Sequence, residues 1–319
     1  MAYTLVIAGA DPEVSPGVDA HNLDQSLDQA LGQIAAGYGA QVGQMEGVHL
    51  PTGAHAARWT VSDLDPASVA QFRTAVADHI PHGPTDVAIA QADVFAASGG
   101  MPKLLVADME STIIAQECLD ELAGDIGARP AVSAITARAM AGELAFEEAL
   151  SERVNLLTGL PVAQLEKLAA RLTFNPGALA FVQTLRAAGA YCALVSGGFT
   201  FFTEQIALAA GFHHHRANTL EIAGDTLTGK VVPPILGVDA KADAVLALTA
   251  ELGISPNEVL TIGDGANDAA MTRLVAHDHS GLGVGYRPKP VLRGIAGVSF
   301  DHADMSAVLA LCPGYQPAA

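Results

Sequence analysis

Four short apolar runs, each followed by turn residues, constrain the fold of this chain more than any other feature. They are LLVA (104–107), CALV (192–195), VLTI (259–262) and GLGVG (281–285). Uninterrupted apolar runs of this length are typical of strands that are buried on both faces. Segments with helical periodicity lie between them, as in a sheet of parallel strands. The sequence therefore predicts an α/β domain with a Rossmann-like parallel sheet.

The connection between the first two runs is unusually long. Residues 108–191 lie between them, far more than a single crossover helix requires. Within this connection, QECLDELAGDI (116–126), VSAITARAMAG (132–142) and FEEALSERVNLL (146–157) have helical patterns. We expect a helical cap, inserted into the sheet domain at about 116–172.

The N-terminal third has a different pattern, in which short strands and helices alternate. The expected order is a strand at 4–9, a helix at 23–39, strands around 40–49 and 56–62, a helix at 66–79 and a strand at 86–91. This β-α-β-β-α-β order is that of a small ferredoxin-like α+β domain. The segment ASGGMP (97–102) is the expected linker. We therefore divide the chain into residues 1–97 and 98–319.

The net charge and the cysteine content limit the compartment in which the protein is expected and the classes of partner that it could bind. The formal net charge of −18 argues against nucleic acid or an anionic membrane surface as a partner. Three widely spaced cysteines fit free thiols in a reducing compartment better than a disulfide framework. The N-terminus lacks a basic leader, and no apolar run reaches the ~18 residues of a membrane span. We expect a cytoplasmic protein that binds no membrane.

Polar residues follow three of the four predicted strands at the point where each strand ends. LLVA leads into Asp108, CALV into Ser196 and Gly197, and VLTI into Gly263 and Asp264. The carboxyl ends of parallel strands share one edge, where ligands bind. A lone Asp after a strand is usually a turn former or a helix cap. Agreement among three strand ends favours a shared site instead.

The residue types at this edge favour phosphate chemistry with a hard metal ion. Carboxylates from separate strands suit Mg²⁺, which takes few protein ligands and keeps oxygens of water and substrate. A carboxylate that faces a phosphate can act as the nucleophile. The Ser196 hydroxyl, the Gly197 amide and the Lys241 ammonium could then stabilise the phosphoryl oxygens. Lys241 taken alone would be read as a surface lysine. The run His213–His215 is expected in a solvated loop instead of a metal site.

These residues form a recognisable pattern. The segments DMEST (108–112), SGGFT (196–200), Lys241 and GDGAND (263–268) resemble the four motifs of the haloacid dehalogenase family, in the same order. The surrounding segments STIIAQECLDELA (111–123), ITARAMAGELAFEEALSERV (135–154), VSGGFTFFTEQIA (195–207) and TIGDGANDAAM (261–271) look like those of bacterial phosphoserine phosphatases. The resemblance covers residues 100–310 or so. The match of residues 1–97 to a small domain found in some members is weaker.

The resemblance implies an activity and its catalytic groups. The expected reaction is Mg²⁺-dependent hydrolysis of O-phospho-L-serine through an aspartyl-phosphate, the last step of L-serine biosynthesis. Asp108 would be the nucleophile and a metal ligand. Glu110 would be the general acid/base and would offer its backbone carbonyl to the metal. Asp264 would be a further metal ligand, and Asp268 would orient a metal-bound water or the loop.

The resemblance also implies how the substrate is held. The phosphate would be bound by Ser196, Gly197, Lys241 and Asn267. From the cap, Glu117 would meet the substrate ammonium and Arg153 its carboxylate, which suits a zwitterionic amino-acid phosphate. Without the family context, Glu117 and Arg153 would be read as an ordinary ion pair on a helix surface. The oligomeric state is not decided by the sequence, and a homodimer is open.

One position departs from the family pattern and leaves alternatives open. The usual first motif is D-x-D-x-T, whereas this chain has Glu110 at the second acid. The longer stem puts the rate in doubt, together with the balance between water and other phosphoryl acceptors. One alternative is a phosphatase or phosphotransferase for another small phosphomonoester. The other is a catalytically weakened regulator that binds an amino acid, for which Glu110 is the sole argument.

Overall fold

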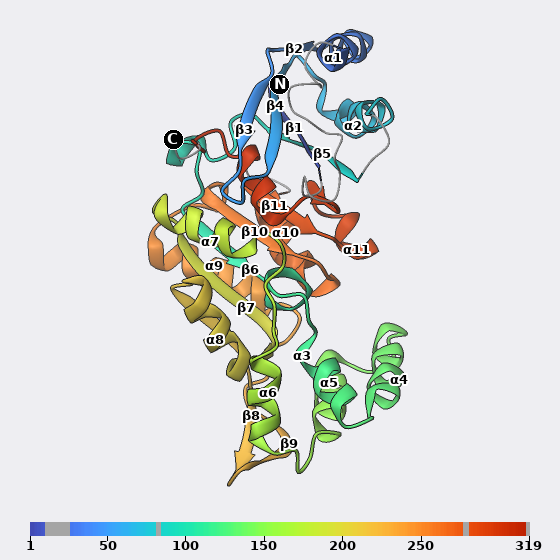
Figure 1. Ribbon diagram of the computed structural model, residues 1–319, viewed down its shortest axis with the longest axis vertical. Coiled ribbons are helices and arrows are strands. Elements are labelled where there is room, and N and C mark those ends of the chain that lie inside the picture. Colours follow the sequence, from blue (N-terminus) through green and yellow to red (C-terminus); the bar gives the residue numbers. More distant parts are fainter. Residues whose placement is uncertain (10–25, 81–83, 277–280, 317–319) are drawn as a thin grey trace.

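The computed structural model describes residues 1–9, 26–80, 84–276 and 281–316 of the 319-residue chain. It is elongated, with a small sheet and two helices at one end, a large sheet in the middle and a group of helices at the other end (Figure 1). Every helix within these described ranges is too short or too polar to traverse a lipid bilayer.

The N-terminal part is the predicted ferredoxin-like unit. Its sheet has the antiparallel order β2-β4-β1-β5, and β3 also pairs with β4. Two helices, α1 (Ser26–Gly37) and α2 (Val69–Ala77), bury apolar side chains against one face of the sheet. The strands are β1 (Tyr3–Gly9), β2 (Gln41–Val42), β3 (Glu46–His49), β4 (His55–Ser62) and β5 (Thr85–Gln91).

The strand predicted around 40–49 and the helix predicted at 23–39 differ in extent from the structure. The strand predicted over 40–49 is two short strands, because residues 43–45 leave the ladder between them. The backbone N–H of Gly43 still donates to the carbonyl of Thr60 at 2.8 Å, so both strands remain along the same edge of β4. Of the helix predicted at 23–39, residues 23–25 lie outside the described residues.

The central sheet has the order β12-β11-β10-β6-β7-β8-β9, and its first six strands are parallel. The four predicted runs are all strands, and β6 lies at the centre. The hairpin partner β9 and the edge strand β12 complete the sheet. The strands are β6 (Leu104–Ala107), β7 (Tyr191–Phe199), β8 (His214–Ala223), β9 (Thr226–Val232), β10 (Val259–Gly263), β11 (Leu282–Tyr286) and β12 (Val298–Phe300).

Helices cover both faces of this sheet, which explains why its strands are apolar throughout. Leu104 and Val106 of β6 pack against α9 (Ala240–Leu252) and α10 (Ala269–Ala276). The alternate residue Leu105 belongs to the cluster on the other face, with α7 (Ala178–Ala187) and α8 (Thr200–Ala210). The short helix α11 (Pro290–Arg293) follows β11.

The inserted cap is helical, as predicted, and consists of α3 (Cys118–Asp125), α4 (Arg129–Met140), α5 (Phe146–Asn155) and α6 (Val162–Ala169). Helix α6 was not distinguished in the sequence. The β8–β9 hairpin extends from the sheet to this end of the molecule (Figure 1). There the backbone of Leu227 exchanges hydrogen bonds with Gly159 and Leu160 at 2.8 and 2.9 Å. The hairpin therefore ties the cap to the sheet.

The expectation of a loop at the histidine run is wrong for His214 and His215, whereas His213 lies in the bend before the strand. His214 and His215 begin β8, which pairs with β7. The side chain of His213 accepts a hydrogen bond from the backbone N–H of Cys192 at 3.0 Å through Nδ1. His215 contacts the hydroxyl of Thr203 at 3.0 Å. His213 and His214 are nevertheless exposed and His215 is half-buried, so the expected contact of the run with solvent is largely retained.

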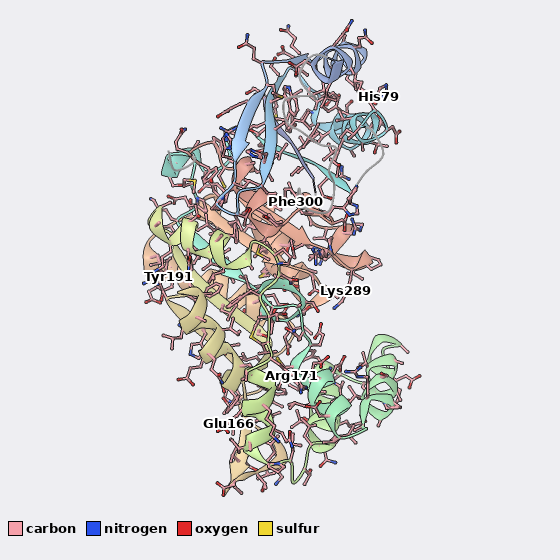
Figure 2. The ribbon with its side chains drawn as sticks, in the orientation of Figure 1. His79, Glu166, Arg171, Tyr191, Lys289 and Phe300 are labelled. Atoms are coloured by element: carbon pink, nitrogen blue, oxygen red, sulfur yellow. The ribbon has the colours of Figure 1, made fainter. Side chains whose placement is uncertain are left out.

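The second face of the N-terminal sheet packs on the edge of the central sheet at β12 and on the 3₁₀ segment Met305–Leu311. Phe300 of β12 is fully buried at this seam (Figure 2). The buried carboxylate of Asp86 accepts hydrogen bonds from the three backbone N–H groups of residues 301–303 at 2.8–2.9 Å. Buried Arg58 donates to the carbonyl of Cys312 at 3.2 Å.

Candidate active site

The polar residues predicted at the strand ends meet at one edge of the central sheet. A cavity of about 500 Å³ lies between this edge and the cap. Of the predicted site residues, it is lined by Asp108, Glu110, Glu117, Arg153, Gly197, Asp264 and Asn267. Ser196 and Lys241 line a small second cavity that shares Gly197 and Asn267 with the first. Asp268 lies beneath both and is fully buried.

A buried ammonium group connects two of the carboxylates. The Nζ atom of Lys241, at the start of α9, lies 2.8 Å from Oδ2 of Asp108 and 2.5 Å from Oδ1 of Asp268. The side chain of Lys241 is only 5% exposed, so the interpretation as a surface lysine is wrong. The other oxygen of Asp108 accepts the backbone N–H of Met109 at 2.7 Å. These contacts fix the orientation of the Asp108 carboxylate.

Opposing effects set the charge of this pair. Burial raises the pKa of Asp108, the Lys241 ammonium opposes the rise, and the nearby carboxylate of Asp268 adds to it. For Lys241, burial lowers the pKa, but the carboxylates of Asp108 and Asp268 outweigh it and the pKa is raised overall. The ammonium therefore stays protonated at neutral pH. It is the countercharge that favours an anionic Asp108 in a buried place.

Asp268 organises the loop that carries Asp264. One of its oxygens, Oδ2, accepts the backbone N–H groups of Asp264 and Gly265 at 3.0 and 2.9 Å. Since its other oxygen contacts Lys241, both are occupied by donors from the protein. Burial raises the pKa of Asp264, which protrudes from this loop at the end of β10. Asp268 thus holds the loop in the conformation that presents Asp264.

A cluster of three buried carboxylates provides the donor set for a metal ion. Asp108, Asp264 and Asp268 each offer an oxygen, and these oxygens lie within 4.8 Å of one another. A set made of carboxylate oxygens alone, without His or Cys, suits a hard cation such as Mg²⁺. The residues present therefore fit a divalent metal ion. Asp268 is the member that is committed to its own loop, because one of its oxygens accepts two backbone N–H groups of that loop and the other contacts Lys241.

The side chain of Glu110 lies at the base of the cap, between the end of β7 and the start of α3. Its Oε1 accepts the backbone N–H of Cys118, the first residue of α3, at 2.8 Å. Loss of water and the nearby Glu117 carboxylate raise the pKa of Glu110 to about 7. Gly198 leaves room for this longer acid, because a Cβ at that position would lie 2.7 Å from Oε2 of Glu110. A carboxyl group in this state can both donate and accept a proton.

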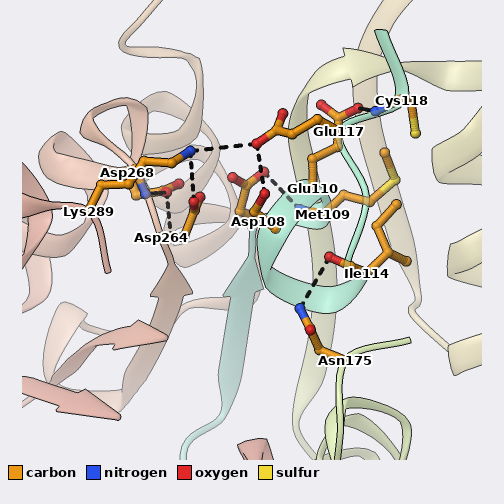
Figure 3. Close-up of polar contacts among 12 residues, drawn as sticks. Asp108, Met109, Glu110, Ile114, Glu117, Cys118, Asn175, Asp264, Asp268 and Lys289 are labelled. Atoms are coloured by element: carbon orange, nitrogen blue, oxygen red, sulfur yellow. Dashed lines mark hydrogen bonds and ion pairs between the residues drawn. The ribbon is translucent and has the colours of Figure 1, made fainter. Parts of the chain in front are cut away.

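The loop after Asp108 has an unusual conformation that aims its side chains. Ser111 has a φ of 54°, in the left-handed region that residues other than glycine rarely adopt. The side-chain amide of buried Asn175 donates to the carbonyls of Thr112 and Ile114 at 2.6 and 3.2 Å, which holds the loop in place. Figure 3 shows the contact with Ile114. Such strain is concentrated at functional sites. The turn brings the Ser111 hydroxyl to the carboxylate of Glu117, at 2.7 Å.

The end of β7 supplies hydrogen-bond donors. The Oγ atom of buried Ser196 accepts the backbone N–H of Gly198 at 3.0 Å, which leaves its own hydrogen to donate. Asn218, which the sequence gave no reason to select, holds this turn. Its amide nitrogen donates to the carbonyl of Gly197 at 2.8 Å, and its oxygen accepts the N–H of Leu236 at 2.8 Å.

The two residues expected to read the substrate's amino-acid groups come from different cap helices. Glu117 precedes α3, and Arg153 lies in the last turn of α5. No ion pair between them occurs among the described residues. Arg153 donates through Nε to the carbonyl of Ala149 at 3.2 Å, which steadies the guanidinium beside the cavity. The cavity thus has charged groups of both signs on its cap side, since Asp120 of α3 lines it together with Glu117 and Arg153.

Lys289 is a cavity residue that the sequence analysis did not select. Its Nζ lies 2.9 Å from Oδ2 of Asp264 and 3.5 Å from Oε1 of Glu117 (Figure 3). A signal for it existed, because Lys289 comes three residues after β11 and so belongs to the same sheet edge as Asp108 and Asp264. The residues after the fourth predicted strand, β11, belong to the site in the same way as those after the other three.

Comparisons with known proteins find relatives of this chain. The family of haloacid dehalogenase-like hydrolases matches residues 105–273. A phosphoserine phosphatase from Archaeoglobus fulgidus is 40% identical over 64% of this chain and 58% of its own length. The chain therefore spans less than two thirds of that relative. A phosphoserine phosphatase from Idiomarina loihiensis is 40% identical over 65% of this chain and 91% of its own length.

Solved structures also resemble the chain. A haloacid dehalogenase family hydrolase from Salmonella enterica serovar Typhi has a TM-score of 0.78 over 98% of this chain and 99% of its own, at 23% identity, which shows the fold. A phosphoserine phosphatase solved as an analogue of its phospho-aspartyl intermediate has a TM-score of 0.60 at 32% identity. It covers 66% of this chain and 98% of its own.

Proposed function

The chain belongs to the haloacid dehalogenase-like hydrolases and, within them, to the phosphoserine phosphatase family, and on this premise we propose its reaction. It hydrolyses O-phospho-L-serine to L-serine and phosphate through an aspartyl-phosphate on Asp108, with Mg²⁺ as cofactor, as the last step of L-serine biosynthesis. The relative solved as a phospho-aspartyl analogue supports the intermediate.

The observation that carries the proposal is the arrangement around one cavity. Asp108 is oriented by Lys241 and the Met109 amide, and Glu110, with a pKa of about 7, lines the same cavity. On the cap side lie two carboxylates, Glu117 and Asp120, and one guanidinium, Arg153. A nucleophile, a proton donor and cap charges of both signs match a phosphate ester of an amino acid.

In the first half-reaction, an oxygen of Asp108 attacks phosphorus and the bond to the serine oxygen breaks. Glu110 donates its proton to that oxygen, so that serine leaves as a neutral alcohol. The Ser196 hydroxyl, the Gly197 amide, the Asn267 side chain and the Lys241 ammonium would stabilise the equatorial oxygens of phosphorus. The product of this step is an acyl-phosphate on Asp108.

In the second half-reaction, water hydrolyses the acyl-phosphate. Glu110, now ionised, takes a proton from the attacking water, so Asp108 is regenerated and phosphate is released. Asp108, Asp264 and the backbone carbonyl of Glu110 would hold the magnesium ion, while Asp268 keeps the loop of Asp264 in place. When bound, Mg²⁺ supplies positive charge that stabilises the anionic oxygens of the phosphoryl group.

Removal of divalent metal is expected to abolish turnover. Three buried carboxylates and a phosphate dianion share this site with the single buried ammonium of Lys241, so a further positive charge is required. In excess EDTA, phosphate release should fall by at least about 100-fold and return when Mg²⁺ exceeds the chelator. EDTA already saturated with Mg²⁺ is the control for effects of the chelator itself. Full turnover in metal-free buffer would contradict the metal assignment.

Arg153→Ala should discriminate between substrates with and without a carboxylate. A charge-assisted contact is worth about 1.5–3 kcal/mol, so the KM for phosphoserine should rise roughly 10- to 100-fold. For O-phosphoethanolamine, which lacks the carboxylate, KM should change by less than about threefold. The matched control is Arg138→Ala, because Arg138 lies on the cap surface and pairs with Glu152 at 2.9 Å. Equal losses for both substrates would mean that Arg153 supports the cap and does not contact the substrate.

The panel that tests the function as a whole is phosphate release from small phosphomonoesters with and without added alcohols. The proposal expects phosphoserine to have the highest kcat/KM and phosphate to be released to water. Preference for a phosphate ester without an amino-acid group would contradict the substrate. A phosphorylated alcohol as the main product would favour a phosphotransferase.

A further inference from the structure

We propose that Lys289 is a specificity-determining residue, which shares the carboxylate of Glu117 with the substrate's ammonium group. This inference rests on the proposed function, because Glu117 is assigned there to the ammonium of phosphoserine. Lys289 would thereby set how strongly the cavity distinguishes an amino-acid phosphate from a phosphate ester without an ammonium group.

The backbone that carries Lys289 is held stiffly, unlike that of most surface lysines. Two prolines, Pro288 and Pro290, flank it, and Lys289 has the extended conformation (φ −62°, ψ 157°) that a following proline imposes. Arg287, the first residue after β11, has a φ of 47° and turns the chain out of the strand. The backbone N–H of Lys289 donates to the carbonyl of Asp264 at 2.7 Å. The lysine stem therefore starts from a fixed point at the edge of the cavity.

The ammonium of Lys289 connects the core to the cap. It contacts Asp264 of the core at 2.9 Å and Glu117 at the entrance to the cap at 3.5 Å. The Glu117 oxygen that it contacts, Oε1, is also the one that accepts the Ser111 hydroxyl. Both donors therefore contact one oxygen, and no donor from the described part of the chain contacts Oε2 of Glu117. Figure 3 shows the side chain of Lys289 with its contacts to Asp264 and Glu117.

The positive charge of Lys289 weakens the attraction between Glu117 and the ammonium group of the substrate. A cation next to Glu117 compensates part of its negative charge, and it repels a second ammonium that approaches the same carboxylate. Removal of the cation leaves Glu117 uncompensated. The cavity would then attract a substrate ammonium more strongly and repel a phosphate ester without one more strongly. The Ser111 hydroxyl still orients Glu117, so the loss of charge outweighs the loss of positioning.

The test compares two substrates that differ in this one group. They are O-phospho-L-serine and 3-phosphooxypropanoate, in which hydrogen replaces the ammonium. The measured quantity is the ratio of their kcat/KM values in the full chain. In Lys289→Met this ratio should rise about three- to tenfold, the size of a half-exposed charge interaction. Lys289→Arg keeps the charge and should stay within about twofold of the wild type.

Two further variants decide whether Lys289 acts through Glu117. In a Glu117→Gln background, Lys289→Met should leave the ratio unchanged, because the carboxylate that the two cations share is gone. Lys167→Met, an exposed lysine on α6 of the cap, is the control for loss of a positive charge at the surface. Melting temperature and far-UV circular dichroism identify any variant that fails to fold, and Lys289→Gln then replaces Lys289→Met.

The outcomes separate this inference from the function on which it rests. A wild-type protein that does not hydrolyse phosphoserine overturns the proposed function. A wild-type protein that does, with an unchanged or lower ratio in Lys289→Met, overturns the role of Lys289 alone. The same result follows from an equal rise in the Glu117→Gln background, which would place the effect of Lys289 elsewhere.

Discussion

Replacement of Asp108 by asparagine is expected to lower kcat by at least about 10⁴-fold while the protein remains folded, an effect on the scale of removing a catalytic nucleophile. The amide has the same shape and can still accept the Met109 N–H at its oxygen. It lacks the negative charge that attacks phosphorus and that Lys241 stabilises. The loss should therefore appear in kcat, and the protein should still fold because Lys241 keeps its contact with Asp268.

The measurement that assigns the nucleophile is covalent. Intact-mass analysis after a rapid acid quench, or trapping with beryllium fluoride, should place the phosphoryl group or its mimic on Asp108. The matched control is Asp125→Asn, which removes an exposed carboxylate of the cap that pairs with Arg171 at 2.7 Å. A label on any other residue, or substantial turnover by Asp108→Asn, would refute the assignment.

Glu110→Gln should lower kcat by about 10²–10⁴-fold, the usual contribution of general acid/base catalysis. Glutamine keeps the length of the side chain, and its oxygen can still accept the N–H of Cys118. The substitution thus isolates the proton, which must reach the departing serine oxygen and later leave the attacking water. The measurement is kcat for phosphoserine, together with a pre-steady-state burst that separates the two half-reactions.

Glu110→Asp is the matched variant, since it keeps the acid and removes one methylene. It should retain kcat within roughly tenfold, because the chemistry is unchanged and only the reach differs. A Glu110→Gln enzyme with the wild-type kcat would be the contrary result. Glu110 would then contribute its backbone carbonyl alone, and the proton would travel by another route.

The positions of the core site residues could be predicted because the strands that carry them are buried on both faces. A fully apolar run followed by a polar residue identifies a strand end, and parallel strands bring such ends to one edge. This logic brought Asp108, Ser196 and Asp264 to one sheet edge, where the structure also has them. The ferredoxin-like order of the N-terminal elements followed in the same way from alternating periodicity.

Other contacts could not be predicted, since they depend on which segments meet in space. Asn218 connects the Gly197 turn to Leu236 from within a strand, where an asparagine carries no sequence signal. Lys289 approaches Glu117, 172 positions earlier in the chain, because β11 and the entrance to the cap lie at the same edge. The strand at His214 and His215 was not predicted for a similar reason, because it forms by pairing with β7.

The seam between the N-terminal sheet and residues 301–315 has a consequence for how the chain folds during synthesis. Contacts across it join residues that are far apart, such as Arg58 with Cys312 and the carbonyl of His49 with the hydroxyl of Tyr315, 266 positions away. The N-terminal sheet can pair its strands early, but one of its apolar faces has no cover until residues 301–315 leave the ribosome. Closing such long loops is slow, and uncovered sheet faces aggregate. During synthesis this face is therefore exposed for longer than the order of the domains suggests.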